Sequence, residues 1–415
     1  MDTSFRVNNV KNITQILVSF YQIVVYGVLG LTYLGLAVGY VPGLRMNRPT
    51  IAFVGSSFLI SLGAINLDEA WQAIDVKTII FLLSMMVVNA NLTYGGFFAR
   101  ALYLLLRLTR SPLGLLIALT VGTGVLSAFF LNDTLALIFT PFTLTLTTAL
   151  KLNPIPYLLA LAAATNIGSV ATLSGNPQNI LIGSFSGIAY LDFLANGLPI
   201  AVAGMAIQII LLYVFYPEVR STVPCENFSL DNQRIYKPLF NKTLFIVAGL
   251  LIGFAIGLPL AQTALIAASL LLITRRLKPE RILTKLDWNL ILMFSGLFIL
   301  SKVTQKLNLI QPFTGIINTS IGLISVTSVL SNLISNVPAV LLLEPLIPSY
   351  DTQSWLLLAF SSTLAGNLTL FGAVANLITV EAAASLGYRL TFWEHLRFGA
   401  PLTVLTLGFV YWWVR

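Results

Sequence analysis

Apolar runs long enough to form helices fill this chain, and they occur in two series with the same internal order. Each series has three apolar runs, then a stretch with a polar tip, then a run interrupted by glycine, and then a last run. One crossing of a bilayer needs about 20 apolar residues. The pattern therefore predicts an all-α polytopic membrane protein. The runs are 18–40, 50–66, 76–94, 113–150, 154–185 and 190–216 in the first series, and 240–258, 260–274, 287–303, 312–348, 354–383 and 396–414 in the second.

The repeated order also predicts how the chain divides. We expect a first repeat over residues 1–216, a cytoplasmic linker over 217–239 and a second repeat over 240–415. Asp75 and Asp287 support this division, because each opens the third apolar run of its series.

Charge predicts that the two repeats have opposite orientations. Residues 68–77 hold three acids and one lysine, a net charge of −2, whereas the corresponding residues 275–287 hold five basic and two acidic residues, a net charge of +3. Basic loops remain in the cytoplasm, so the two segments should lie on opposite sides of the membrane. We therefore expect an inverted repeat in a multi-pass protein of the plasma (inner) membrane, with an external N-terminus.

Each series carries a polar tip inside an apolar stretch, Asn132-Asp133-Thr134 in the first and Ser335-Asn336-Val337 in the second. A straight helix through the first tip would place a carboxylate against lipid, at a cost of about 2.5–3.5 kcal/mol. A re-entrant hairpin that turns at the tip buries the same side chains in protein, where non-helical backbone is tolerated. We therefore expect a re-entrant hairpin in each series.

The run after each tip is broken by glycine in a shared pattern. A broken helix exposes carbonyl oxygens that can hold a cation, and N–H groups whose positive end favours an anion. Paired interrupted helices in corresponding halves indicate the binding site of a secondary transporter. The segments TNIGSVATLSGNPQNI (165–180) and GNLTLFGAVANLI (366–378) align Thr172 with Thr369, Gly175 with Gly372, and Asn179 with Asn376.

These tips and breaks define the predicted site. Amide side chains both donate and accept, so they suit an oxyanion or a small ion without adding charge. Amide and small residues also hold membrane helices together, but two matching pairs of interruptions favour a shared site. Asp133, Asn132 and Asn336 are the predicted coupling-ion residues, and a sodium ion would lie near Asn132, Asp133 and Gly175. The predicted substrate-binding residues are Asn132, Thr134, Asn166, Gly168, Thr172, Gly175, Asn176, Asn179, Ser335, Asn336, Asn367, Thr369, Gly372 and Asn376.

The motifs Asn-Asp-Thr…Thr-Pro (132–141), Asn-Ile-Gly-Ser…Gly-Asn-Pro-Gln-Asn (166–179), Ser-Asn-Val-Pro (335–338) and Gly-Asn-Leu-Thr-Leu-Phe-Gly (366–372) resemble the ion transporter superfamily. This superfamily contains arsenite permeases, citrate–metal symporters and divalent anion:sodium symporters, and the motifs most resemble the arsenite permease and putative anion permease branch. The resemblance implies two inverted five-helix repeats, each with a re-entrant hairpin and a broken helix. It also implies a homodimer and an elevator-like cycle. The sodium symporters carry Ser-Asn-Thr at both tips, so their sodium sites do not transfer whole.

The sequence thus predicts a secondary-active transporter of a small inorganic or organic anion, such as an oxyanion with arsenite-type efflux, coupled to Na⁺ or H⁺. No cofactor is expected beyond the coupling ion. A cation/proton antiporter of the Na⁺/H⁺ type, with Asp133 as carrier, is the open alternative. A passive channel is disfavoured because broken helices with a central site favour alternating access.

Composition disfavours other classes. Only 9% of the residues are charged, against about 25% in soluble proteins. The net charge of +8 is spread over short loops, so no nucleic-acid partner is expected. The chain has no GxxxxGK[ST] motif, and an arsenite pump would therefore need a separate ATPase subunit. An intramembrane aspartyl protease would need a second aspartate facing Asp133.

Three expectations concern residues outside the site. His395, the single histidine, is expected in a cytoplasmic loop with a structural role. Cys225, the single cysteine, is expected to be an incidental loop residue, and a lone cysteine excludes an internal disulfide. Arg100, Arg107 and Arg110 share one helical stripe, which predicts a helix lying in the cytoplasmic interface.

Overall fold

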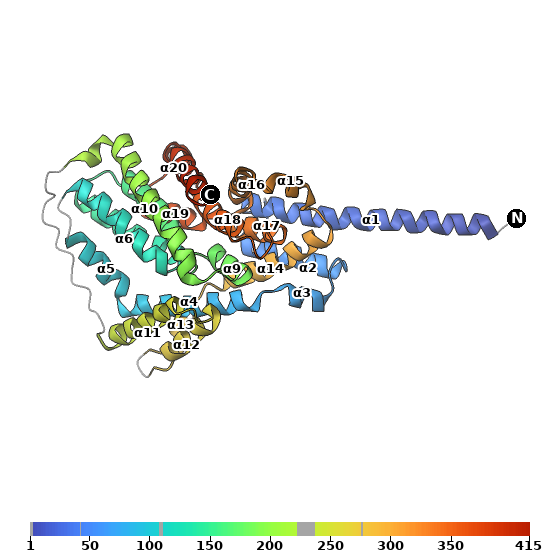
Figure 1. Ribbon diagram of the computed structural model, residues 1–415, viewed down its shortest axis with the longest axis horizontal. Coiled ribbons are helices and arrows are strands. Elements are labelled where there is room, and N and C mark those ends of the chain that lie inside the picture. The colour runs from blue at the N-terminus through green and yellow to red at the C-terminus, as the bar shows by residue number, and fades with distance from the viewer. Residues whose placement is uncertain (1–2, 42, 108–110, 222–236, 275–276) are drawn as a thin grey trace. The chain divides into compact units, whose positions relative to one another are not determined.

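The computed structural model describes residues 3–41, 43–107, 111–221, 237–274 and 277–415, and the secondary structure of these residues is helical apart from an isolated bridge between Tyr40 and Asn47 (Figure 1). The all-helical expectation is confirmed. The α-helices are α1 (Thr3–Val38), α2 (Arg48–Ser61), α3 (Leu67–Ala73), α4 (Val76–Gly95), α5 (Phe97–Arg107), α6 (Pro112–Phe129), α7 (Asn132–Ala149), α8 (Ile155–Ser169), α9 (Pro177–Ser186), α10 (Tyr190–Phe215), α11 (Lys237–Ala255), α12 (Leu260–Leu272), α13 (Pro279–Leu283), α14 (Trp288–Lys306), α15 (Thr314–Ile317), α16 (Ser320–Ile334), α17 (Asn336–Leu343), α18 (Thr352–Ala365), α19 (Val374–Ser385) and α20 (Phe392–Trp413). Three short 3₁₀ turns are η1 (Pro217–Arg220), η2 (Gln311–Phe313) and η3 (Glu344–Leu346).

The chain forms two compact units. The smaller unit comprises the described residues up to Asp75 together with Trp288–Gln311, and so contains α1, α2, α3 and α14. In this unit α2 packs against both α1 and α14. The contact with α14 is close, because a Cβ on Gly296 would lie 2.7 Å from the carbonyl oxygen of Ala52.

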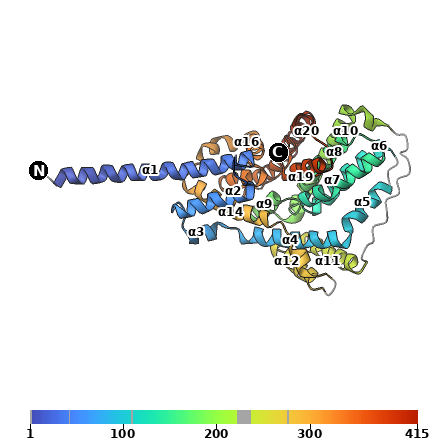
Figure 2. The same cartoon turned by 180° about the vertical axis from the view of Figure 1, so that it is seen from behind.

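The larger unit comprises the described residues of 76–287 and 312–415. Here α4 packs against α11 and α12, α6 against α8, α7 against α19, and α16 against α18. Figures 1 and 2 also show α10 beside α20, and these two helices are in contact. All the predicted site residues belong to this unit.

Many helices are apolar enough to cross a bilayer. Within the described residues, five qualify by length and hydropathy, namely α1 from Phe20, α4, α6, α10 and α11, and a sixth span arises if α14 and the segment Gln311–Ile317 are counted as one. Large apolar side chains face outward, such as Phe245, which is 82% exposed. Exposed apolar surface of this extent is expected where lipid covers the protein.

Some expectations fall on residues that the structure does not describe. Arg110, Cys225 and most of the predicted linker (222–236) lie outside the described residues, as does the side chain of Arg107. Arg100 lies in α5, and the interfacial position of this helix stays a prediction. The repeat boundaries also stay a prediction, because a compact unit is defined by contacts and a repeat by internal symmetry.

Candidate functional site

Two broken helices form the centre of the site. The chain leaves α8 at Ser169 and begins α9 at Pro177, and it leaves α18 at Ala365 and begins α19 at Val374. These two segments confirm that the predicted glycine-containing runs are broken helices. In the first, the Asn176 side chain caps α9 by accepting from the Asn179 backbone N–H at 2.8 Å.

Asn179 and Asn376 hold the two breaks in the same way. The Asn179 amide donates to the carbonyl oxygens ten and seven residues earlier, Ser169 at 3.0 Å and Thr172 at 2.9 Å. The Asn376 amide donates to the carbonyl oxygens ten and seven residues earlier, Gly366 at 2.7 Å and Thr369 at 3.1 Å. Each asparagine therefore ties the start of one half-helix to the unwound end of the other.

Each tip contacts the glycine of its own break. At the first tip, the Asn132 backbone N–H donates to the carbonyl of Gly175 at 3.3 Å. At the second, the Asn336 amide nitrogen, oriented toward the nearest carbonyls, donates to Gly372 at 3.0 Å and to Ser362 at 2.9 Å. Gly175 and Gly372 are the pair that the sequence pattern aligned, so tip and break meet at corresponding positions in both halves.

Asn166 joins the two halves of the chain. Its amide nitrogen donates to the side-chain oxygens of Asn367 at 2.9 Å and Asn376 at 3.2 Å. Its own side-chain oxygen accepts from the Asn132 amide at 3.3 Å. A hydrogen-bonded line therefore runs from the first tip, through α8, to the second break.

The Thr363 hydroxyl makes a second bridge. It accepts from the amides of Asn176 at 3.2 Å and Gln178 at 3.1 Å, which lie at the start of α9. In the same orientation of Asn336, the Gln178 amide also donates to the Asn336 side-chain oxygen at 3.2 Å. Both breaks and both tips consequently share one network of amides, hydroxyls and carbonyls.

Glycine is required where backbones approach closely. A Cβ on Gly175 would lie 2.5 Å from the carbonyl oxygen of Ser169, and one on Gly372 would lie 2.7 Å from the Asn332 side-chain oxygen. A Cβ on Gly168 would clash with the backbone of Gly124 in α6. These three predicted residues therefore contribute to the site by lacking a side chain, which lets neighbouring segments approach closely.

Ser335 adopts a backbone conformation that side chains rarely take. It separates α16 from α17 with φ +78° and ψ 160°, a region that is populated almost only by glycine. Such a conformation costs on the order of 1–3 kcal/mol and occurs preferentially at functional sites. The second tip therefore turns at a single strained residue, whereas the first turns over the extended pair Phe130–Leu131.

Among the site residues predicted from the sequence, two buried polar atoms have no partner among the described residues. They are the side-chain oxygen of Asn179 and the amide nitrogen of Asn367, and both residues are at most 1% exposed. Buried polar groups are normally hydrogen-bonded, and unpaired ones cost about 1–3 kcal/mol. One acceptor and one donor of these residues are thus without a hydrogen bond.

The remaining predicted residues differ in their roles. The Thr172 hydroxyl donates to the carbonyl of Ala128, which is a structural contact between the first break and α6. The Thr369 hydroxyl donates to the Asn332 side-chain oxygen at 2.9 Å, which links the second break to α16. Asp133 and Thr134 are half-buried in the first turn of α7. The Asn132 side-chain oxygen accepts from the Asp133 backbone N–H at 3.0 Å.

The expectation that His395 lies in a loop is wrong. His395 lies in the first turn of α20, is 2% exposed, and its Nε2 donates to the carbonyl of Asn367 at 3.0 Å. The capping box of Thr391 and Glu394 begins α20 four residues before His395 and so places the ring inside the protein. One turn further on, a Cβ on Gly399 would clash with the same carbonyl.

Sequence reasoning missed five contributors besides His395. Their small hydroxyl and amide side chains carry no charge, so only position could have indicated them, through the motif 166–179 for two of them and through spacing from the aligned asparagines for the others. They are Ser169, Gln178, Asn332, Ser362 and Thr363.

The site is rich in neutral oxygens and poor in formal charge. The hydrogen bonds described above come from amides, hydroxyls, backbone groups and one histidine, and none comes from lysine or arginine. The described residues contain no group of three His, Cys, Asp or Glu side chains that could form a metal cage. Carbonyl and amide oxygens of this kind are the ligands that hard cations take in proteins.

Paired broken helices that meet polar tips inside an apolar helical protein define the class of integral membrane transporters. The characteristic sequence profile of citrate transporters (CitMHS) matches residues 36–364. The chain belongs to this family, which lies within the ion transporter superfamily and consists of transporters rather than enzymes.

Similar proteins share nearly the whole length of the chain. The silicon efflux transporter LSI3 of Oryza sativa subsp. japonica is 32% identical over 88% of this chain and 92% of its own length. The inner membrane protein YbiR of Escherichia coli is 28% identical over 84% and 89%. The putative transporter arsB of Dictyostelium discoideum is 25% identical over 88% and 86%. The predicted resemblance to the ion transporter superfamily is confirmed.

Proposed function

We propose that this protein is a secondary-active transporter of a small inorganic or organic anion, with an oxyanion as the favoured substrate and Na⁺ or H⁺ as the coupling ion. The observation that carries the proposal is the line Asn132–Asn166–Asn376, which joins the first tip to the second break. Both halves contribute to one site, as alternating access around a fixed centre requires. The relatives named for silicon efflux and arsB support a small solute.

The site offers an oxyanion hydrogen-bond donors without a fixed positive charge. The Asn367 amide nitrogen is buried without a partner, and it lies in the second break, before α19 begins. The first N–H groups of a helix carry partial positive charge. Hydrogen bonds from amides and helix ends would therefore hold the anion, and a co-bound cation would offset its charge.

The inverted repeat is part of the proposal, and reciprocal packing supports it. In the smaller unit α2 of the first half packs on α14 of the second, and in the larger unit α12 of the second half packs on α4 of the first. The pairs α1–α2 and α11–α12 also pack alike. A topology reporter at Pro279 should be cytoplasmic and one at Asp68 external. Both reporters on one side would contradict the inverted repeat.

Coupling through Asp133 belongs to the same proposal. The Asp133 carboxylate follows directly on Asn132, whose side chain and backbone contact α8 and the first break. A cation between Asp133, Asn132 and the Gly175 carbonyl would connect ion binding to the geometry of the break. An elevator-like cycle in a homodimer completes the proposal.

A cation/proton antiporter is the second candidate, and Asp133 is the observation that favours it. It is the acid at a tip of the site, and a half-buried carboxylate in a membrane protein can carry a proton. In that case the amide network would bind the cation alone, and no anion would be bound.

The experiment is uptake and efflux by the purified protein in proteoliposomes, with a panel of oxyanions including silicate, arsenite and citrate, at varied Na⁺ and pH. Transport of one anion that depends on a Na⁺ or H⁺ gradient supports the proposal. Exchange of Na⁺ for H⁺, with no anion bound or transported, would contradict the anion-transporter proposal and support the cation/proton antiporter.

A further inference from the structure

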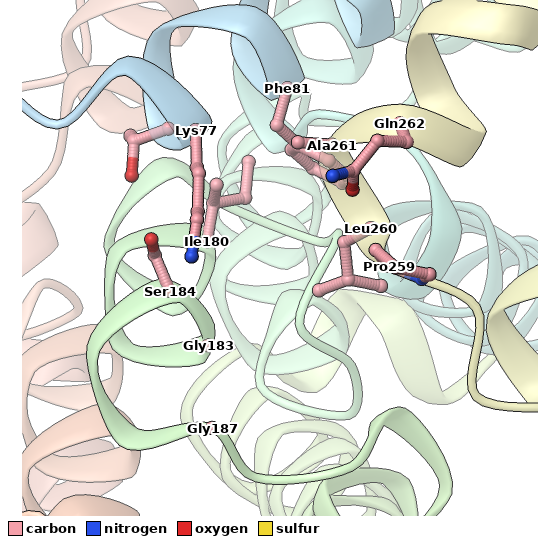
Figure 3. A pocket seen from close by; sticks show the side chains of 11 residues that line it. Lys77, Phe81, Ile180, Gly183, Ser184, Gly187, Pro259, Leu260, Ala261 and Gln262 are labelled. Carbon is pink, nitrogen blue, oxygen red and sulfur yellow. The ribbon is translucent and has the colours of Figure 1, made fainter.

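A pocket of about 360 Å³ lies in the larger unit, away from the tips, where three helix ends meet. It is lined by the first turns of α4, by α9 from Ile180 onward with Gly187 just after its end, and by the first turn of α12 (Figure 3). The volume falls within the range of about 300–1,000 Å³ that is typical of small-molecule sites. A small oxyanion with several water molecules fits such a space, since each water occupies about 30 Å³.

The lining combines an apolar wall with a few polar groups. Phe81, Ile180 and Leu260 supply apolar surface, while Lys77 and Ser184 supply an ammonium group and a hydroxyl. Figure 3 shows the Lys77 side chain extending from α4 toward α9. Among the described residues that line the pocket, Lys77 is the only ionisable one, so it is the charged group that a solute there would meet. A positive group in a partly apolar cleft concentrates anions at its mouth.

The pocket is connected to the site through α9. Ile180 lines the pocket, and its neighbour Asn179 holds the first break. Because α9 has ten residues at 1.5 Å each, its two ends are about 15 Å apart. A solute in the pocket would therefore lie no farther than about 15 Å, the length of α9, from the first break.

The three helix ends should share one side of the membrane. The topology argued above places the start of α4, the start of α12 and the end of α9 on the external side. Their convergence on one pocket agrees with that orientation, because ends on opposite faces could not line a single cavity of this size.

We propose that this pocket is an external anion-binding subsite through which the transported oxyanion enters or leaves the site at the breaks, with Lys77 as its charged anchor. The proposal rests on the proposed function and adds to it a second binding position. It predicts that the affinity for external anion depends on Lys77, while turnover at saturation does not.

The test is counterflow exchange in proteoliposomes, which measures external affinity whichever direction the transporter works in. Lys77→Gln should raise the KM for external oxyanion roughly tenfold, the effect of losing one hydrogen bond to a charged group. Lys77→Arg should restore most of the affinity. Lys302→Gln, which removes an exposed lysine of α14, is the matched control and should leave the KM unchanged. An unchanged KM in Lys77→Gln would overturn the subsite and leave the proposed function intact.

A labelling experiment tests the pocket even without transport. In a Cys225→Ser background, Gln262→Cys places one thiol in the pocket wall, and an impermeant maleimide added outside should label it. Oxyanions from the panel should slow this labelling in the Lys77 protein and not in Lys77→Gln. Labelling that no anion slows, or that occurs only from the inside, would overturn the proposal. A wild type that moves no anion would count against the proposed function instead.

Discussion

Asn166 and Asn376 lie 210 positions apart, yet the amide nitrogen of Asn166 donates to the side-chain oxygen of Asn376 over 3.2 Å. The Asn376 amide nitrogen also donates to the carbonyl oxygens of Gly366 and Thr369, and these bonds stabilise the second break. A displacement of Asn166 in α8 would therefore directly alter the hydrogen bonding of the second break. The site is therefore formed jointly by both halves of the chain, and neither half contains it alone.

Asn166→Leu should reduce transport at least about tenfold while the protein still inserts. The substitution removes the contacts to Asn132, Asn367 and Asn376, and each lost bond leaves a buried group unpaired at about 1–3 kcal/mol. Proteoliposome uptake measures the effect. Asn91→Leu is the control, because this buried asparagine of α4 donates only to Val87 of its own helix. Equal transport by both variants would return Asn166 to a helix-packing role.

Asp133→Asn separates anion transport from cation antiport. If Asp133 binds or carries the coupling ion, the variant should lose its dependence on Na⁺ or H⁺ and still bind the anion. If the protein exchanges cations for protons, the same variant should lose all activity. Direct binding of the oxyanion panel to wild type and variant distinguishes the two outcomes. Anion binding that disappears together with coupling would contradict the assigned role of Asp133.

His395 should act as a positioning residue for the second break. His395→Phe keeps the ring volume but removes the hydrogen bond to the Asn367 carbonyl, so the substrate KM should rise about fivefold, with a smaller change in maximal rate. His395→Gln can still donate and should restore the wild-type KM. Equal thermal stability of the two variants would exclude a general packing defect. A wild-type KM in His395→Phe would refute the positioning role.

The pair Glu69–Lys306 predicts a pH dependence in the smaller unit. The Lys306 ammonium, 2.7 Å from the carboxylate, lowers the pKa of Glu69, and the Asn66 backbone N–H adds to this effect. A lowered pKa in the folded state means that the stabilisation is present above the unfolded pKa and is lost as pH falls through the folded pKa. Glu69→Gln should therefore lower Tm slightly at neutral pH and not in acid. Both groups are exposed, so high salt should also remove the difference.

Much of the architecture could be predicted because its causes are local. Apolar runs of helix length and the Gly175 and Gly372 interruptions fix where helices form and break, and the structure has them there. The alignment of Asn179 with Asn376 was also informative, since both make the same two bonds at the same offsets. Local patterns of this kind depend on backbone geometry, which the sequence encodes directly.

Other features depend on contacts that no local pattern records. Asn166 and Asn367 look alike in the two motifs, but Asn166 lies within α8 and Asn367 lies past the end of α18. His395 resembles a loop residue beside Glu394 until the capping box of α20 turns it inward. The conformation of Ser335 also escapes prediction, because serine gives no signal for a positive φ. Each of these is set by tertiary packing.

The packing of α2 on α14 has a consequence for biosynthesis. Roughly 230 residues separate the end of α2 from the start of α14, and ribosomes add about 5–20 residues per second. For about 10–45 s, therefore, the nascent α2 sits in the bilayer with Ala52 uncovered, before Gly296 is made. During that interval the insertion machinery or lipid must occupy the face that α14 will later take, and a ribosome that stops early leaves α2 without the helix that covers Ala52.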